Sequence, residues 1–146
     1  MRAVVGSWPE PGFADLVGFV GGRDEGFAVV SPAGKGWAEF EVHDRHGEAV
    51  LLADLTVGDE VREELDELEE FLDQHQGSAT ARATVSAHLA SASAVVGMQI
   101  VPSRYDESVA AANHLIAFLE KWPGVLTQVD TVGWYDGDRL ILQEAE

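Results

Sequence analysis

The sequence contains no cysteine, which excludes disulfide scaffolds, thiol catalysis and cysteine-ligated zinc. It also has no apolar run of about 18 residues, the length that a membrane-spanning helix needs. The N-terminal segment lacks the sustained apolar stretch of a secretory signal peptide. From these absences the sequence predicts a cytoplasmic protein.

Basic residues are scarce. Nine Lys and Arg stand against 26 Asp and Glu, and the net charge is −17 at pH 7. Nucleic acids and anionic membranes bind basic surfaces, so the composition predicts neither a nucleic-acid partner nor a membrane partner. A general solubility or halophilic trait is an alternative explanation of the acidity, and under it the charge has no binding role.

Motifs for catalysis and cofactor binding are also lacking. Around Lys35, Val29 and Gly36 stand where a phosphate-binding loop needs its first glycine and its hydroxyl residue. The cluster His43-Asp44-Arg45-His46 contains metal-ligand types, but residues three apart on a strand face opposite sides, so a solvated hairpin turn is the better interpretation. The sequence therefore predicts no cofactor and no metal site, and it favours a protein without catalytic activity.

The strongest positive signal lies in residues 56–77. Nine carboxylates fall between Asp59 and Asp73, with Arg62 as the single basic residue. Apolar residues recur there at spacings of four, three and four, and are Val61, Leu65, Leu68 and Leu72. This pattern predicts an amphipathic helix with one buried stripe, which Phe71 is expected to join.

The limits of this helix are predicted from its flanks. Thr56 precedes the first turn and can accept a hydrogen bond from a backbone N–H there, as an N-cap does. Gly77 can adopt the left-handed conformation that follows many last turns. The predicted acidic helix therefore spans 56–77.

The remaining chain predicts an α+β fold in a single domain, 1–146. Residues 1–55 form a predicted β-meander, with strands at 2–5, 15–20, 27–30, 37–43 and 48–55. Residues 78–146 read as β-β-α-β-β, with strands at 80–89 and 94–101, a helix at 105–122, and strands at 125–135 and 138–142 that flank the turn Asp136-Gly137. The predicted architecture is an antiparallel sheet with two main helices on one face, and its two halves share a strand-then-helix order.

The exposed carboxylates of the acidic helix are the first candidate binding site, and they are Glu60, Glu63, Glu64, Glu67 and Glu70. Facing a basic surface, such a row would steer association. The leading hypothesis is therefore a non-catalytic interaction protein that binds a basic partner, such as an inhibitor, an immunity-type protein masking a nuclease, or a DNA mimic. A homodimer stays open as a further assembly.

A second candidate site lies on the predicted strand 37–43. Glu39, Glu41 and His43 alternate with apolar residues and so share one face with Trp37. A cleft on that face would suit a small enzyme or a ligand-binding protein, whereas a solvent-facing side of the sheet is the simpler interpretation. Near the C-terminus, Trp134 and Tyr135 must point to opposite faces of a strand, so one of them is expected at a surface or an interface.

Overall fold

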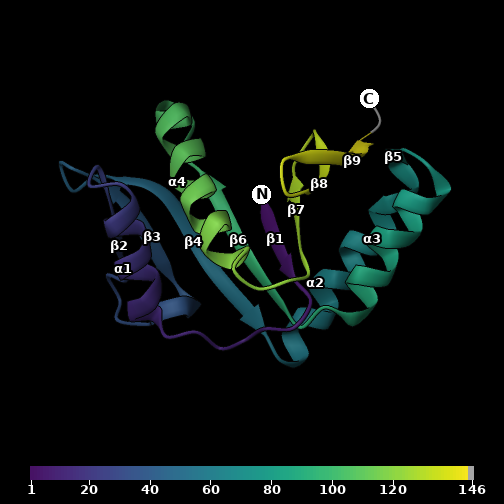
Figure 1. Cartoon of the computed structure of the whole chain (residues 1–146), viewed down its shortest axis with the longest axis horizontal. Helices are drawn as coiled ribbons and strands as arrows, with labels where there is room; N and C mark the ends of the chain where they lie inside the picture. The colour runs from purple at the N-terminus through teal and green to yellow at the C-terminus, as the bar shows by residue number, and fades with distance from the viewer. Residues whose placement is uncertain (145–146) are drawn as a thin grey trace. The chain divides into compact units, whose positions relative to one another are not determined.

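The computed structural model describes residues 1–144, which form four α-helices and nine strands paired antiparallel (Figure 1). The chain thus has the predicted α+β fold, with four helices in place of two main ones. The strands are β1 (Arg2–Val5), β2 (Phe27–Val30), β3 (Phe40–Asp44), β4 (Ala49–Val57), β5 (His75–Gln76), β6 (Ala94–Ile100), β7 (Val125–Val129), β8 (Gly133–Asp136) and β9 (Arg139–Glu144). The helices are α1 (Phe13–Arg23), α2 (Asp59–Glu70), α3 (Ala79–Ser91) and α4 (Tyr105–Leu119), with 3₁₀ turns η1 (Gly36–Ala38), η2 (Phe71–Gln74) and η3 (Pro102–Arg104).

The chain folds into two compact units, each assembled from separate stretches of sequence. Unit 1 contains 1–8, 56–96 and the stretch that begins at Trp122, and unit 2 contains 9–55 and 97–121. The predicted halves do not coincide with these units, because the chain leaves each unit and returns to it. The prediction of a single domain stays a prediction.

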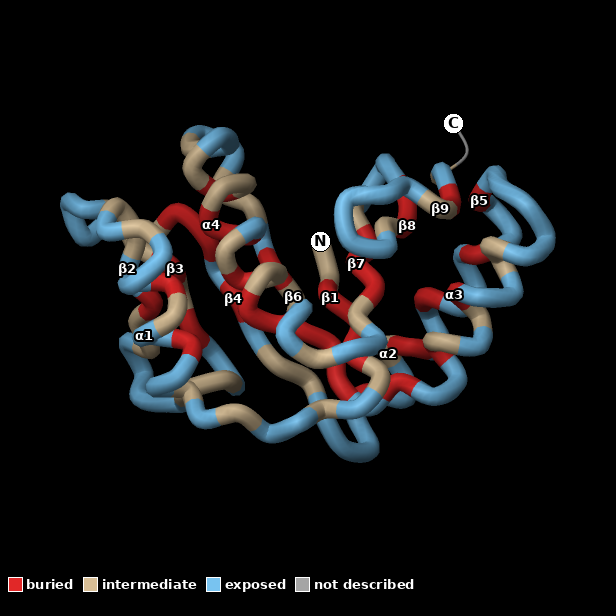
Figure 2. Tube along the Cα trace, viewed as in Figure 1, coloured by how far each residue is buried: buried red, intermediate tan, exposed pale blue. Residues whose placement is uncertain are grey.

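In unit 1, helices α2 and α3 pack against each other, and the strand order is β6-β1-β7-β8-β9-β5. Their shared core contains the whole predicted stripe of α2. Figure 2 shows buried residues along β1 and along the inner sides of both helices. The other members of this core are Val4, Val85, Leu89, Ala92, Val95, Leu126, Trp134 and Leu142.

The acidic helix is shorter than predicted at both ends. Thr56 belongs to β4, and Gly58 occupies the N-cap position with a φ of 72° and no side-chain cap. The helix passes into η2 at Phe71, and the chain is extended again at His75. Gly77 does not adopt the predicted left-handed conformation. Its lack of a side chain matters for packing instead, because a Cβ there would collide with Leu142.

The predicted strand at 80–89 is wrong, because this segment is the middle of helix α3. Ser78 caps the helix by accepting a hydrogen bond from the backbone N–H of Ala81 at 3.0 Å. Only Val85 and Leu89 are buried within it. The predicted β-β-α-β-β order of 78–146 therefore fails at its first strand.

In unit 2, the strand order is β2-β3-β4-β6, and helices α1 and α4 pack against each other. The prediction of a strand at 15–20 is wrong, since Leu16 and Val20 lie four residues apart on the buried side of α1. Trp37 lies in η1 and not in a strand, and its indole Nε1 donates to the carbonyl oxygen of Pro11 at 2.8 Å. Edge-to-face contacts of Trp37 with Phe13 and Phe40 extend this core.

The C-terminal strands form the predicted hairpin with its turn one residue later than predicted, because Asp136 pairs with Arg139 and the two turn residues are Gly137, with a φ of 62°, and Asp138. The predicted strand 125–135 is interrupted at 130–132, so it forms both β7 and β8. Gly133 opens β8 at a position where a Cβ would overlap the backbone of Leu142, so only glycine allows β8 and β9 to approach this closely.

Helix α4 and strand β6 match their predictions closely. Strand β6 is buried over most of its length. Leu115 and Leu119 are fully buried, as the predicted stripe requires, whereas Ile116 is only half-buried.

The burial of Leu115 leads to a stability prediction. Leu115→Ala should lower the free energy of unfolding by about 2–5 kcal/mol, because it removes apolar contacts and leaves a cavity. Leu140→Ala is the matched control, since Leu140 is 41% exposed and its truncation opens no cavity. Urea denaturation of the two variants measures the difference, and a loss below about 0.5 kcal/mol for Leu115→Ala would contradict the assigned core.

Candidate functional site

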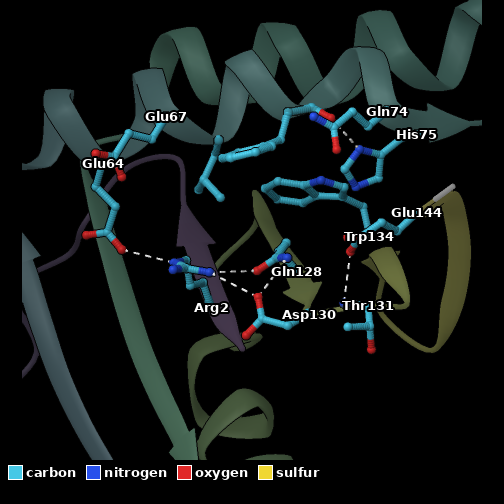
Figure 3. A pocket seen from close by; sticks show the side chains of 12 residues that line it. Arg2, Glu64, Glu67, Gln74, His75, Gln128, Asp130, Thr131, Trp134 and Glu144 are labelled. Carbon is cyan, nitrogen blue, oxygen red and sulfur yellow. Dashed lines mark hydrogen bonds and ion pairs between the residues drawn. The ribbon is translucent and has the colours of Figure 1, made fainter. Parts of the chain in front are cut away.

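A pocket of about 270 Å³ lies beneath helix α2 and entirely within unit 1 (Figure 3). Its apolar lining comes from Leu68 and Phe71 of the helical segment and from Trp134 of β8. Its polar lining includes Arg2 of β1 and Gln128 of β7. The pocket therefore brings together residues from both ends and the middle of the sequence.

The register of the paired strands brings these distant residues together. Arg2 pairs with Gln128, Gln128 with Trp134, and Trp134 with Leu142, so the four residues form one row across β1, β7, β8 and β9. Residues two positions apart on a strand share a face, so this row lies on the same face as buried Val4. The pocket thus forms where the apolar layer under α2 gives way to polar side chains.

Arg2 is the centre of a polar network in this pocket. Its Nε donates to Glu64 Oε1 at 3.2 Å, and its Nη1 donates to Gln128 Oε1 at 3.0 Å and to Asp130 Oδ1 at 3.3 Å. The N-terminal ammonium adds an ion pair of 3.1 Å with Asp130 Oδ2. Arg2 consequently ties helix α2 to the loop after β7.

The carboxyl of Asp130 is adapted to these cations. Burial alone would raise its pKa, but the hydrogen bonds from the N-terminal ammonium and Gln128, with the charges of that ammonium and Arg2, outweigh this effect and lower the pKa below its ordinary value. Asp130 therefore stays ionised well below neutral pH and neutralises part of the charge on Arg2.

His75 and Trp134 close the inner end of the pocket, and their exposed fractions are 6% and 1%. The Nδ1 of His75 lies 2.9 Å from the carbonyl oxygen of Phe71, and because a carbonyl only accepts, Nδ1 must carry the hydrogen. In an uncharged ring with its hydrogen on Nδ1, Nε2 is an acceptor. This atom is buried and, within residues 1–144, has no hydrogen-bond partner.

Other contacts hold His75 in place. Its carbonyl oxygen accepts a hydrogen bond from Arg82 at 2.6 Å, and its backbone pairs with Glu144 of β9. The carboxylate of Glu144, which also lines the pocket, accepts a hydrogen bond from the backbone N–H of Thr131 at 2.8 Å. The unpartnered nitrogen is therefore part of a fixed framework.

Phe71 lies at the mouth of the pocket and is 54% exposed, so the expectation that it joins the buried stripe is wrong. Successive residues of an α-helix are about 100° apart, which puts Glu60, Glu64, Glu67 and Phe71 on one side of the helix, roughly 90° from the stripe. Figure 3 shows Glu64 and Glu67 on this side of α2. The ring of Phe71 thus continues a row of carboxylates.

The predicted partner-binding carboxylates fall into two groups. Glu60, Glu63, Glu67 and Glu70 are exposed, and within residues 1–144 no cation pairs with them. Glu64 differs, because its side chain is 28% exposed and pairs with Arg2. The four exposed residues are called the acidic face below.

The arginines nearest to α2 are bound to groups outside the acidic face. Arg62 donates to the carbonyl oxygens of Leu89 and Ala90 at the end of α3, at 2.6 and 3.2 Å, and lies 3.6 Å from Asp66. Arg82 is bound to His75, as described above. None of these cations reaches the acidic face.

The second predicted site is only partly assembled. His43 Nε2 and Glu41 Oε1 lie 2.8 Å apart on β3, as residues two apart on a strand can. Glu39 does not join them, because it follows η1 and pairs with Lys35 at 3.4 Å. The neighbour of Glu41 on β4 is Leu52, which is 37% exposed, so this side of β3 faces outward.

The cluster around Asp44 holds an ion-pair network. Arg104 Nη2 donates to Asp44 Oδ2 at 2.6 Å, and Arg104 Nη1 donates to Glu48 Oε2 at 2.9 Å. The bond from Arg104, with backbone hydrogen bonds from Glu48 and His46, lowers the pKa of Asp44 to about 2. Across residues 1–144, no three His, Asp or Glu side chains are arranged to hold a metal ion.

Sequence reasoning missed most of the pocket. Arg2 and Gln128 are separated by 126 positions and meet only through the pairing of β1 with β7. A local signal did exist for Phe71, since its helical angle matches that of Glu64 and Glu67 better than that of Leu68. Trp134 stood out only as one of two adjacent aromatics.

The low pKa of Asp44 leads to a prediction on acid stability. Its folded pKa of about 2 lies below the ordinary value of 3.8, so its contribution is complete above about pH 4 and is lost as the pH falls toward 2. Asp44→Asn keeps an oxygen for the two backbone donors but loses the ion pair with Arg104. Wild type should therefore be more stable than Asp44→Asn at pH 6, and this advantage should shrink toward zero near pH 2.

Urea midpoints measured at pH 6, 4 and 3 test this expectation. Asp138→Asn serves as the control, because Asp138 is exposed and has no ion-pair partner in the described part of the chain. If the difference in urea midpoint between wild type and Asp44→Asn stays constant with pH, the ion pair with Arg104 does not cause the stability difference.

Among residues 1–144, no helix combines the length and the apolar character needed to cross a lipid bilayer. No protein-family model matches the chain, and comparison with curated proteins and with solved structures finds no significant similarity.

Proposed function

We propose that this protein binds a basic protein partner through the acidic face of helix α2. The observation that carries the proposal is the set of four exposed carboxylates without a neutralising cation, on a helix whose neighbouring arginines are engaged inside unit 1. A partner with a complementary row of Lys or Arg would supply the missing charge. An inhibitor, an immunity-type protein or a DNA mimic would act in this way, by covering the basic site of its target.

The charge pattern of α2 supports a role beyond solubility. Within the helix, Asp59/Glu63, Glu60/Glu64, Glu63/Glu67 and Asp66/Glu70 are like-charged pairs four residues apart, each destabilising by about 0.2–0.5 kcal/mol. Arg2 and Arg62 carry the nearest positive charges, yet Arg2 binds Glu64 and Gln128 and Arg62 binds Asp66 and the carbonyl oxygen of Leu89, so neither pairs with the acidic face. The repulsion is thus maintained, and a basic partner would remove it on binding.

The proposal predicts a position-dependent effect of charge on association. The probe is a fluorescein-labelled decapeptide of arginine, which stands in for the basic surface. In Glu60→Gln/Glu63→Gln/Glu70→Gln, the association rate at low salt should fall by about tenfold or more, because electrostatic steering of this kind raises rates by roughly 10- to 1000-fold. Stopped-flow anisotropy across a salt series gives the rates.

The matched control is Glu10→Gln/Glu25→Gln/Glu120→Gln, which changes the net charge equally at exposed positions of unit 2. Its association rate should fall clearly less. Equal losses in the two variants would contradict the proposal and favour the general solubility explanation. Both variants should fold, and the first should keep or slightly raise its urea midpoint because helix repulsion is relieved.

A further inference from the structure

We propose that the pocket beneath α2 seats one arginine side chain of the basic partner, against Phe71 and with His75 Nε2 as a hydrogen-bond acceptor. This inference rests on the proposed function, because it names the residue of the partner that the acidic face would guide. It adds a defined recognition site to a surface that otherwise selects only by charge.

The size of the pocket favours a single side chain. Pockets for drug-sized ligands usually occupy about 300–1,000 Å³, and this one, at about 270 Å³, lies below that range. It opens beside Glu67, so a chain lying along the acidic face passes its mouth. An inserted side chain from such a chain is the ligand that fits both the volume and the position.

The charge of the pocket favours a cation. Arg2 forms ion pairs with Glu64 and Asp130, so its positive charge is already neutralised within the protein. Glu67 and Glu144 also line the pocket, and in the described part of the chain neither pairs with a cation. The lining is therefore net negative and would repel a carboxylate or phosphate ligand.

The aromatic wall favours a planar cation. Phe71 is 54% exposed, and among residues 1–144 no other ring stacks on its side chain. A guanidinium group can lie flat on such a ring and still direct its N–H groups sideways. An ammonium group lacks this plane, so arginine should be preferred to lysine.

The unpartnered nitrogen of His75 gives an independent indication of the ligand. A buried polar atom without a partner is costly, and in the uncharged ring whose Nδ1 donates to Phe71, Nε2 is an acceptor. The ligand must therefore supply a donor at the inner end of the pocket. Guanidinium supplies five N–H groups and no acceptor, which matches this need.

Entry to the inner end requires one side chain to move. His75 and Trp134 have exposed fractions of only 6% and 1%, whereas Phe71, which lines the same pocket, is half exposed. We expect outward rotation of Phe71 to open a path toward Nε2, with its ring lying against the entering guanidinium. The ¹⁵N NMR signals of His75 and Trp134 therefore report entry of a ligand into the pocket. Contact of a ligand with the acidic face alone should leave these signals unchanged.

The test uses three blocked tripeptides, Gly-X-Gly, in which X is arginine, lysine or citrulline. Citrulline has nearly the shape of arginine but no charge. In ¹⁵N NMR titrations of the whole chain, the arginine tripeptide should shift the Trp134 indole signal and move His75 Nε2 toward the hydrogen-bonded value. Its dissociation constant should be lower than that of the citrulline tripeptide by about tenfold or more.

Two substitutions of Phe71 locate the site, and both should fold because the side chain is half exposed. Phe71→Ala should weaken the arginine tripeptide by about tenfold, whereas Phe71→Tyr keeps the ring and should bind like wild type. Glu60→Gln/Glu63→Gln/Glu70→Gln lies outside the pocket lining and should change tripeptide affinity much less than Phe71→Ala does.

Two results would overturn the inference. Equal binding of the citrulline and arginine tripeptides would rule out recognition of a cation. The NMR signals of His75 and Trp134 could stay unchanged in the tripeptide titration while the association rate of the arginine decapeptide still falls in the acidic-face variant. This result would reject the pocket and leave the proposed function in place. The arginine tripeptide could instead bind the pocket while the association rate of the decapeptide is the same in the acidic-face variant and in its control. This result would support the pocket and contradict the proposed function.

Discussion

Burial of one apolar stripe allows helix α2 to exist. The helix carries like charges on successive turns, and each repulsive pair destabilises it by about 0.2–0.5 kcal/mol. A single buried leucine contributes roughly 1.5–3 kcal/mol, so Leu65 alone offsets several such pairs. The helix is therefore held by its contact with α3 and the strands of unit 1, and its carboxylates can remain unneutralised only because that contact is strong.

The parts of the fold that could be predicted carry clear local patterns. Strand β6 is a continuous apolar run, α4 has a regular stripe, and Asp136-Gly137 is a strong turn signal. Helix α1 was missed because Gly18, Gly21 and Gly22 resemble turn residues, although apolar neighbours can hold glycine in a helix. Helix α3 was missed because its alanines, threonines and serines leave a narrow stripe, yet Ser78 before an alanine-rich segment was an available N-cap signal.

The pocket could not be predicted, because it depends on pairings between distant strands. The acidic side of α2 follows from helical geometry, and this accounts for Glu64 and Glu67. The opposite wall depends on Arg2 lying beside Gln128 and Gln128 beside Trp134, which are relations of register between β1, β7 and β8. No local pattern in one sequence specifies such a register, so long-range pairing was the missing information.

Under the proposed function, the acidic face and the pocket would act at different distances from the partner. Charges on an exposed helix act over about a Debye length, roughly 8–10 Å at physiological salt, and they raise the rate of encounter with any basic surface. They discriminate poorly between basic partners. In this proposal the pocket would act only at contact, where its volume, the ring of Phe71 and the acceptor on His75 would restrict which side chain can enter. Salt should therefore weaken association more than it speeds dissociation, because the pocket is partly buried and its interactions are less screened.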